Sequence, residues 1–534
     1  MFIVLIIFIS IFIAHFPVLL GDFLKQDDWN ATFWNMNDLW SHPEFHNSAV
    51  EMFRPFATLT LFLADYISLN IENAKYVRFL SIVLISISAY VTYIWQVKFS
   101  PEKKFLALSF SILAFCLPPF QLVTSTAGYW GFILSLLCGQ FGLIYFYKVV
   151  MEDKNFILKN KYIIYSFILI LLGCLNYALT MMFYFIFLLI FYLHNIENKN
   201  FSEKEKYLFL AKATIFIFAI MLFYIFLAKT YHYIFDIVPV NVERSVHIDF
   251  NIINKFLHIL AMIKFSANIY DLSPILKVDI KYFLIFILIV YSLGLSTVIS
   301  KKKKDFSSKI LEYLLIVFSS LILLIFTYAP ALPVKPSFPI DISFRYLIAT
   351  MPFLLFIVLW SIYNILNFEL ISKNLKNVRN IFFIFFIILG VKQTNYIIEK
   401  EVSGPHIKEI KYIKSYVDEK LIKEIKNGEK PTLIIIRNPI VDSIFNENKY
   451  VLSRDYFLRT TFSHGWLVSA GIYILRSNAI KTIPTHKVLQ WDNDAIIIKS
   501  YWGYIISVNK INTLDRKYIN NSIIIDTREL SVKE

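Results

Sequence analysis

Long apolar runs recur along the chain and constrain its fold more than any other feature. Each run approaches the length of about 20 residues that crosses roughly 30 Å of hydrocarbon. Of the 534 residues, 57% are hydrophobic and 17% are charged, whereas soluble domains are about a quarter charged. The net charge of +14 could indicate nucleic-acid binding, but the Lys and Arg residues cluster in short loops between apolar runs, as in membrane proteins. We therefore predict a polytopic α-helical membrane protein that binds membrane lipid and no nucleic acid.

We predict eleven transmembrane helices. The first is a retained anchor, because it lacks the basic start and small-residue cleavage site of a signal peptide. The expected spans are Phe2–Leu20, Tyr76–Val97, Phe105–Leu117, Tyr129–Val149, Tyr162–Tyr177, Thr180–Leu193, Leu208–Ala228, Tyr282–Ile299, Ile310–Tyr328, Tyr346–Leu366 and Ile381–Ile397. The apolar segment Pro55–Leu69 would reach only about 22 Å as a helix, so we expect it to lie along the membrane interface.

The distribution of basic residues orients these spans. If Pro55–Leu69 does not cross and the N-terminus is cytoplasmic, every short basic loop falls inside, as the positive-inside rule requires. Counting that segment as a crossing would place all of them outside. The loops carry Lys98, Lys103 and Lys104; Lys148, Lys154, Lys159 and Lys161; Lys199, Lys204 and Lys206; Lys301–Lys304; and Lys373, Lys376 and Arg379.

The predicted topology divides the chain into two domains. Residues 1–397 form the transmembrane domain, with outer loops at 21–75, 118–128, 229–281 and 329–345. Residues 398–534 are predicted to form a small extracytoplasmic α/β domain, with a helical pattern at His406–Lys426 and β-rich runs at Thr432–Arg437 and Ala495–Lys499. The three cysteines lie in apolar runs, which predicts buried free thiols without disulfides or metal-type spacing.

An acidic loop follows the first span and contrasts with the basic chain. Gly21–Met52 contains six carboxylates and the single cation Lys25. Within it, Asp27-Asp28-Trp29 offers a general base and hard oxygen ligands for a divalent cation such as Mg²⁺ or Mn²⁺. The Trp29 ring could anchor the loop at the membrane interface, which favours Asp28 slightly over Asp27 as the base. The alternative is a solvated acidic loop without chemistry.

Two arginines share the predicted outer face with this acidic pair. Arg54 precedes Pro55 at the start of the interfacial segment, and Arg345 lies at the mouth of the tenth span. Guanidinium groups bind phosphate in a bidentate fork, although an arginine at this depth can also simply reach lipid headgroups. The spans are nearly free of charge apart from Lys392, which argues against an ion-coupled transporter. The histidines of Tyr231–Asp279 lack metal-ligand spacing.

These features together resemble the GT-C superfamily of integral-membrane glycosyltransferases, which use polyprenyl-phosphate-linked sugars. The resemblance covers residues 1–400 as architecture: an acidic pair after the first span, an interfacial helix, about eleven spans, Arg345-Tyr346 entering a late span, and an extracytoplasmic C-terminal domain. It implies that Asp28 or Asp27 is the catalytic base or a metal ligand. It also implies that Arg54 and Arg345 bind phosphate.

The sequence departs from the family pattern in two places. The C-terminal tail lacks the Trp-Trp-Asp motif of the oligosaccharyltransferase branch. Gln121 stands near the position where some relatives have a Glu after the proline of the second outer loop, so an acidic role there is in doubt. We predict that Gln121, Tyr129 and Trp29 contact substrate, while aromatic residues such as Tyr129 could equally belong to the interfacial belt.

The function that follows is transfer of a sugar from a polyprenyl-phosphate donor to a cell-envelope glycan or lipid acceptor, such as lipopolysaccharide. The reaction is expected on the outer face of a bacterial cytoplasmic membrane, without a cofactor other than the divalent cation. An O-antigen polymerase or ligase is one alternative, although its large loop would lie between spans. A non-enzymatic flippase for lipid-linked sugars is another, although we find no repeats or charged central cavity.

Overall fold

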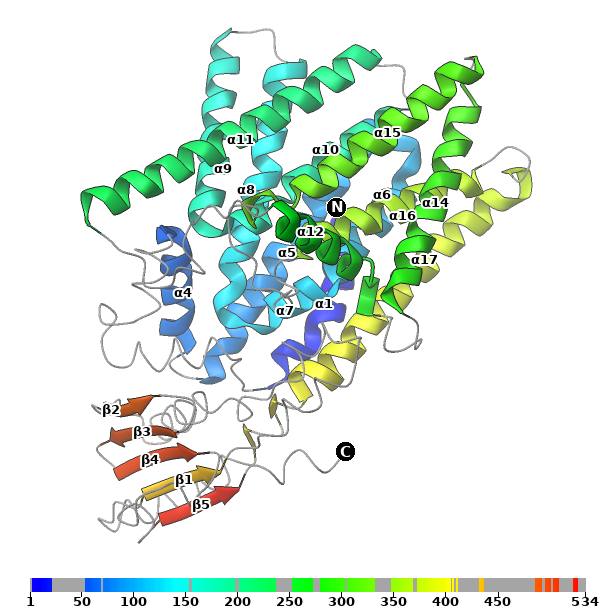
Figure 1. Cartoon of the computed structure of the whole chain (residues 1–534). Helices are drawn as coiled ribbons and strands as arrows, with labels where there is room; N and C mark the ends of the chain where they lie inside the picture. Colours follow the sequence, from blue (N-terminus) through cyan, green and yellow to red (C-terminus); the bar gives the residue numbers. More distant parts are fainter. Residues whose placement is uncertain are drawn as a thin grey trace.

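The computed structural model is a bundle of membrane-length helices followed by strands of a separate sheet (Figure 1). It describes residues 2–21, 53–68, 71–152, 156–196, 201–236, 252–271, 279–302, 305–331, 347–367, 372–404, 406–407, 410–411, 432–436, 486–491, 495–500, 503–508 and 522–526. The acidic pair Asp27-Asp28, Trp29 and Arg345 lie outside the described residues.

The helical part consists of long apolar helices joined by short turns. The α-helices are α1 (Phe2–His15), α4 (Pro55–Ser68), α5 (Ala74–Phe99), α6 (Lys104–Leu113), α7 (Pro118–Ser125), α8 (Trp130–Tyr147), α9 (Phe156–Met181), α10 (Tyr184–Asn195), α11 (Glu203–Ile234), α12 (Ile252–Ser266), α14 (Ile280–Ser300), α15 (Phe306–Phe326), α16 (Thr350–Leu366) and α17 (Ser372–Ile397). The 3-10 turns are η1 (Phe16–Leu19), η4 (Ile71–Asn73), η5 (Pro101–Lys103), η6 (Ala114–Cys116), η7 (Ala127–Tyr129), η9 (Ile269–Asp271) and η10 (Ala329–Ala331), and the π-helical segments are η8 (Lys148–Glu152) and η12 (Ile398–Ser403).

The chain is a multi-pass membrane protein. Among the described residues, eight helical segments are long and apolar enough to cross a membrane, and a bent pair, Pro101–Cys116 with Pro118–Ser125, would make a ninth. Two further predicted spans correspond to α10 and α16, which are apolar but have only 12 and 17 residues. The eight are Phe2–Leu19, Ile71–Phe99, Ala127–Glu152, Asn160–Met181, Glu203–Ile234, Ile280–Ser300, Phe306–Phe326 and Asn377–Lys400.

Two predicted boundaries differ from the structure for identifiable reasons. The expected turn 118–128 contains α7, because Pro118-Pro119 supplies a first helical turn preset by proline, and the axis bends by 53° there. The predicted span Leu208–Ala228 lies within the longer α11, whose polar start is held by a capping box. The Ser202 hydroxyl accepts from the Glu205 amide, and the Glu205 carboxylate accepts from the Ser202 amide.

The segment predicted to lie at the interface is a helix of 14 residues, α4. It packs against α5, α8, α9 and η7, and it lies beside the first turns of α8. The Trp130 indole donates to the Thr60 carbonyl at 2.8 Å, and Ala64 packs on Val77 and Ala127.

The basic loops that follow α5, α8 and α16 gather at one end of the bundle. The Lys98 ammonium pairs with the Glu152 carboxylate at 2.5 Å, which connects the end of α5 to the end of η8. Lys103 lies 5.5 Å from the ring centroid of Tyr363 and the Arg379 guanidinium lies 4.3 Å from the same centroid. These contacts connect the loop after α5 to the end of α16 and to α17.

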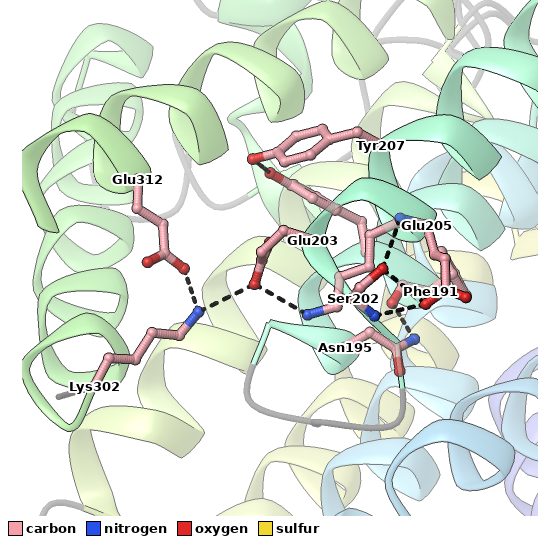
Figure 2. A network of polar contacts seen from close by, with 10 residues as sticks. Phe191, Asn195, Ser202, Glu203, Glu205, Tyr207, Lys302 and Glu312 are labelled. Carbon is pink, nitrogen blue, oxygen red and sulfur yellow. Dashed lines mark hydrogen bonds and ion pairs between the residues drawn. The ribbon is translucent and has the colours of Figure 1, made fainter. Parts of the chain in front are cut away.

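The two remaining basic loops join the same end. The Lys301 ammonium donates to the Asn367 carbonyl at 3.4 Å, which connects the α14–α15 loop to the end of α16. Lys302 pairs with Glu312 of α15 and, at 3.7 Å, with Glu203 at the start of α11. Figure 2 shows Lys302 between these two carboxylates. All five loops that the sequence assigns to one side of the membrane are therefore connected by polar contacts.

Five strands form a mixed sheet near the C-terminus. They are β1 (Thr432–Ile436), β2 (His486–Trp491), β3 (Ala495–Ser500), β4 (Gly503–Val508) and β5 (Ser522–Asp526), in the order β2-β3-β4-β1-β5. The central β1 is parallel to both β4 and β5, while β2, β3 and β4 are antiparallel. Runs of isoleucine in β1, β3 and β5 suit strands, because β-branched residues favour the extended backbone. Most of the helical pattern predicted at 406–426 lies outside the described residues.

Candidate functional site

Arg54 lies at the point where the chain returns from the acidic loop to the helices. Its guanidinium carbon is 5.2 Å from the ring centroid of Tyr177 in α9, a separation typical of cation–π contacts. The side chain is half-buried, so one face of the guanidinium is supported by an aromatic ring and the group still reaches the surface. A guanidinium carries five N–H donors in a planar fork, so an interaction with Tyr224 leaves other donors for an oxyanion.

The backbone beside Arg54 has an uncommon conformation. Phe53 has a φ of 50°, in the left-handed region that residues other than glycine rarely adopt. The Tyr224 hydroxyl of α11 donates to the Phe53 carbonyl at 3.3 Å and also interacts with the Arg54 side chain. The Phe53 ring packs 5.1 Å from the ring of Tyr231. Two tyrosines of α11 and one of α9 thus fix both the main chain and the guanidinium of this turn.

A series of stacked rings continues from Tyr177 into α8. Tyr177 stacks on Phe132 with ring centroids 4.0 Å apart, and Phe132 stacks on Tyr129 at 4.6 Å. The structure therefore connects Tyr129 and Arg54, two residues singled out from the sequence, through two intervening rings. We call Tyr129, Phe132, Tyr177 and Arg54 the aromatic–arginine stack.

A break in α9 makes this stack possible. Tyr177 has φ −149° and ψ 94°, which are extended rather than helical values. Its backbone amide donates to the Ser135 hydroxyl at 3.0 Å instead of to a carbonyl of its own helix, and the side-chain amide of the neighbouring Asn176 donates to the Gly131 carbonyl at 2.6 Å. The Ser135 hydroxyl of α8 thus satisfies the interrupted backbone, the Asn176 side chain adds a second link to α8, and the break turns Tyr177 toward α4.

Gln121 lies away from the stack, in a fully buried position between α7 and α17. Its amide nitrogen donates to the Cys116 carbonyl at 2.9 Å and lies 3.4 Å from the Thr394 hydroxyl. The same region holds His15, whose ring nitrogens lie 2.9 Å from the Thr124 hydroxyl and from the Phe115 carbonyl. These contacts tie α1, α7 and α17 together. Access of a substrate to Gln121 would require that packing to open.

Two buried charged residues inside the predicted spans were not recognised from the sequence. Arg78, in the first turns of α5, is fully buried and donates to the Gly21 carbonyl at 3.1 Å. Glu312 is largely buried beside Lys302. A single charge near the end of a long apolar run is easily taken for a headgroup contact, and only its burial distinguishes it. Arg78 matters here because Gly21 is the last described residue before the acidic loop.

The predicted outer histidines include one described residue with a clear structural role. His258 of α12 hydrogen-bonds to the Tyr328 hydroxyl after α15, and burial lowers the pKa of His258, so the ring is neutral near pH 7. Among the described residues, no three His, Cys, Asp or Glu side chains are grouped to bind a metal ion. The candidate ligands Asp27 and Asp28 lie outside the described residues.

No protein-family model matches the chain, and no curated protein matches it.

Proposed function

We propose that this protein is a membrane glycosyltransferase that moves a sugar from a polyprenyl-phosphate donor to a glycan or lipid acceptor of the bacterial cell envelope. The observation that carries the proposal is the half-buried Arg54 guanidinium on the Tyr177 ring. Arg54 lies where the chain returns from the acidic loop. At the start of that loop, the fully buried Arg78 donates a hydrogen bond to the Gly21 carbonyl.

The chemistry requires a base and a group that stabilises a phosphate. The acceptor hydroxyl oxygen attacks the anomeric carbon of the donor, the bond from that carbon to the phosphate oxygen breaks, and the proton passes to a carboxylate. Asp28, or alternatively Asp27, would take the proton, as the family resemblance implies. The Arg54 fork would pair with the departing lipid phosphate, and Arg345 would add a second guanidinium. Tyr129 is buried and stacks on Phe132, so it would support the stack that holds Arg54 rather than offer a free face to the sugar.

A divalent cation fits the same proposal as a group bound by either Asp27 or Asp28. Carboxylate oxygens are the ligands that Mg²⁺ prefers, and Mg²⁺ commonly bridges protein carboxylates and substrate phosphates. When bound, the cation would supply further positive charge for the phosphate. The arginines would orient the donor, and the carboxylate not engaged by the cation would remain available as the base.

We also propose eleven spans with the basic loops in the cytoplasm. Two facts about helix direction support this count. The Asn395 amide near the end of α17 donates to the Ile13 carbonyl near the end of α1 at 2.6 Å, and η1 packs on η12, so α1 and α17 end on the same side. An odd number of crossings is therefore needed from the first span to the last. Eight crossings do not meet this condition, whereas nine or eleven do.

The short helices α10 and α16 favour eleven over nine. The α16 helix ends beside Lys103 and Arg379 at the end of the bundle where the basic loops gather. The α11 helix starts at that same end, beside Lys302, while α9 ends near α4 at the opposite end. The α10 helix must therefore connect the two ends. Every described residue of α10 is buried, which suits a short helix surrounded by protein rather than lipid.

Residues 398–534 complete the proposed topology as an extracytoplasmic α/β domain. The five-stranded sheet supplies its β part, and Figure 1 shows this sheet beyond the end of the bundle at which α17 ends. This location agrees with a domain that follows an outward-running last span.

The orientation is tested by labelling single cysteines with a membrane-impermeant maleimide in intact cells. We expect modification of cysteines placed at Asn37 and Asn448 but not at Lys302, because Lys302 belongs to the connected basic loops. Labelling at Lys302 in intact cells, without labelling at the other two positions, would reverse the proposed orientation.

The activity itself is tested with the purified protein in nanodiscs. We expect release of undecaprenyl phosphate when a panel of undecaprenyl-phosphate sugars is supplied with envelope glycolipid extracted from a deletion strain of the source organism. A flippase would instead move a fluorescent lipid-linked sugar across proteoliposomes without forming undecaprenyl phosphate. Movement without release would replace the glycosyltransferase proposal.

A further inference from the structure

The start of the acidic loop is held in a fixed position by residues that are distant in sequence. Gly21 follows η1, and its carbonyl accepts a hydrogen bond of 3.1 Å from the fully buried Arg78. On its other side, Gly21 faces Ile407, in the segment that leads from α17 into the C-terminal region. A β-carbon added to Gly21 would lie 2.3 Å from Ile407 Cγ1 and 2.4 Å from its Cδ1.

The segment preceding Gly21 is anchored as well. His15, at the end of α1, is fully buried and hydrogen-bonded through both ring nitrogens. The Leu20 amide donates to the Pro17 carbonyl at 3.3 Å, which closes η1. The chain therefore has little freedom between the membrane helix and Gly21.

The C-terminal side of this contact is also well packed. Val402, Ser403, His406 and Ile410 are buried, and the η12 segment contacts η1, α7 and α17. Ile407 thus belongs to a segment that packs against the helices. Because Gly21 has no side chain, the Ile407 side chain can approach its main chain closely.

We propose that Arg78 and Ile407 form a clamp on Gly21 that positions the acidic loop for catalysis, and that the segment after α17 thereby connects the C-terminal domain to the active site. This inference rests on the proposed function. Arg78 and Ile407 are positioning residues, since they would act through the carboxylates that follow Gly21. A displacement of about 1 Å in a reacting group can cost roughly 10²-fold in rate, so loss of the clamp should reduce turnover.

The test is a rescue experiment on the full-length protein. Gly21→Ala should reduce kcat by about 10-fold to 10²-fold and leave KM for the donor unchanged, because the donor phosphate would be bound by Arg54. Adding Ile407→Ala removes the atoms that the new β-carbon meets, so the double variant should recover most of the lost kcat. Arg78→Lys, which cannot place the same planar donor, should also reduce kcat.

The matched control is a second glycine that faces an isoleucine. A β-carbon on Gly142 of α8 would lie 2.6 Å from Cγ1 of Ile170 in α9, far along α8 from the stack. Gly142→Ala should lower the melting temperature without changing kcat per folded molecule. If Gly21→Ala behaves in the same way, or if Ile407→Ala does not rescue it, Gly21 has only a structural role and the clamp is wrong.

A measurement without sugar chemistry separates this inference from the proposed function. Spin labels at Gln26, in the acidic loop, and at the exposed Lys392 of α17 report the distance between the loop and the bundle. Gly21→Ala should change that distance distribution, and Gly21→Ala/Ile407→Ala should restore it. If the distances respond while wild-type protein transfers no sugar, the clamp holds and the glycosyltransferase proposal fails. An unchanged distribution in Gly21→Ala overturns the clamp whatever the activity.

Discussion

Replacing both Asp27 and Asp28 by asparagine is expected to reduce sugar transfer by about 10²–10⁴-fold, the usual cost of removing a general base. Asparagine keeps the size and hydrogen bonding of aspartate but cannot accept the proton of the acceptor hydroxyl. Loss of a bound cation would add to the same effect. The rate is measured as release of undecaprenyl phosphate by purified protein.

The single variants and a matched carboxylate sharpen this expectation. Asp28→Asn should be the more severe single change if Trp29 fixes the depth of its neighbour. Asp38→Asn removes another carboxylate of the same loop and should leave the rate near that of wild type. All variants should keep the wild-type melting temperature if, as the sequence predicts, this acidic loop is solvated, because exposed charges contribute only about 0–1 kcal/mol to stability. A double variant that transfers sugar at the native rate would remove the acidic pair from the mechanism.

Changing Arg54 to lysine is expected to weaken binding of undecaprenyl phosphate by about 10–10²-fold, since hydrogen bonds to a charged group contribute about 1.5–3 kcal/mol. Lysine retains the charge but loses the planar fork and the stacking on Tyr177. Binding is measured as the rise in melting temperature on adding the lipid phosphate to detergent-solubilised protein. Undecaprenol, which lacks the phosphate, should produce no Arg54-dependent rise.

The other end of the bundle provides a matched control. Arg379 also lies over a tyrosine ring, with its guanidinium carbon 4.3 Å from the Tyr363 centroid, but it belongs to the end where the basic loops gather. Arg379→Lys should alter stability without changing the response to undecaprenyl phosphate. Arg345→Lys should resemble Arg54→Lys if both arginines bind the phosphate. Equal responses of wild type and Arg54→Lys would exclude Arg54 as a phosphate ligand.

The sequence by itself determined the membrane class and the approximate positions of the helices. Apolar runs of membrane length leave few alternatives, because backbone polar groups in hydrocarbon must be satisfied within the helix. The same reasoning separated Pro55–Leu69 from the spans, and this segment forms α4, a helix of 14 residues that is not among the eight membrane-length segments. The grouping of the basic loops followed from their charge alone, and the contacts of Lys98, Lys301 and Lys302 connect them at one end.

Only the tertiary structure decided which outer residues meet. Local pattern cannot reveal that α9 breaks at Tyr177, because the interruption is stabilised by Ser135 of another helix. That break determines what supports Arg54. Arg78 was missed for a related reason, since its significance depends on Gly21, 57 positions away. Hydropathy is a local property of the sequence, so it predicts where the membrane helices are. The roles of Arg54 and Arg78 depend on contacts with residues distant in the sequence, and only the packing of the helices determines those contacts.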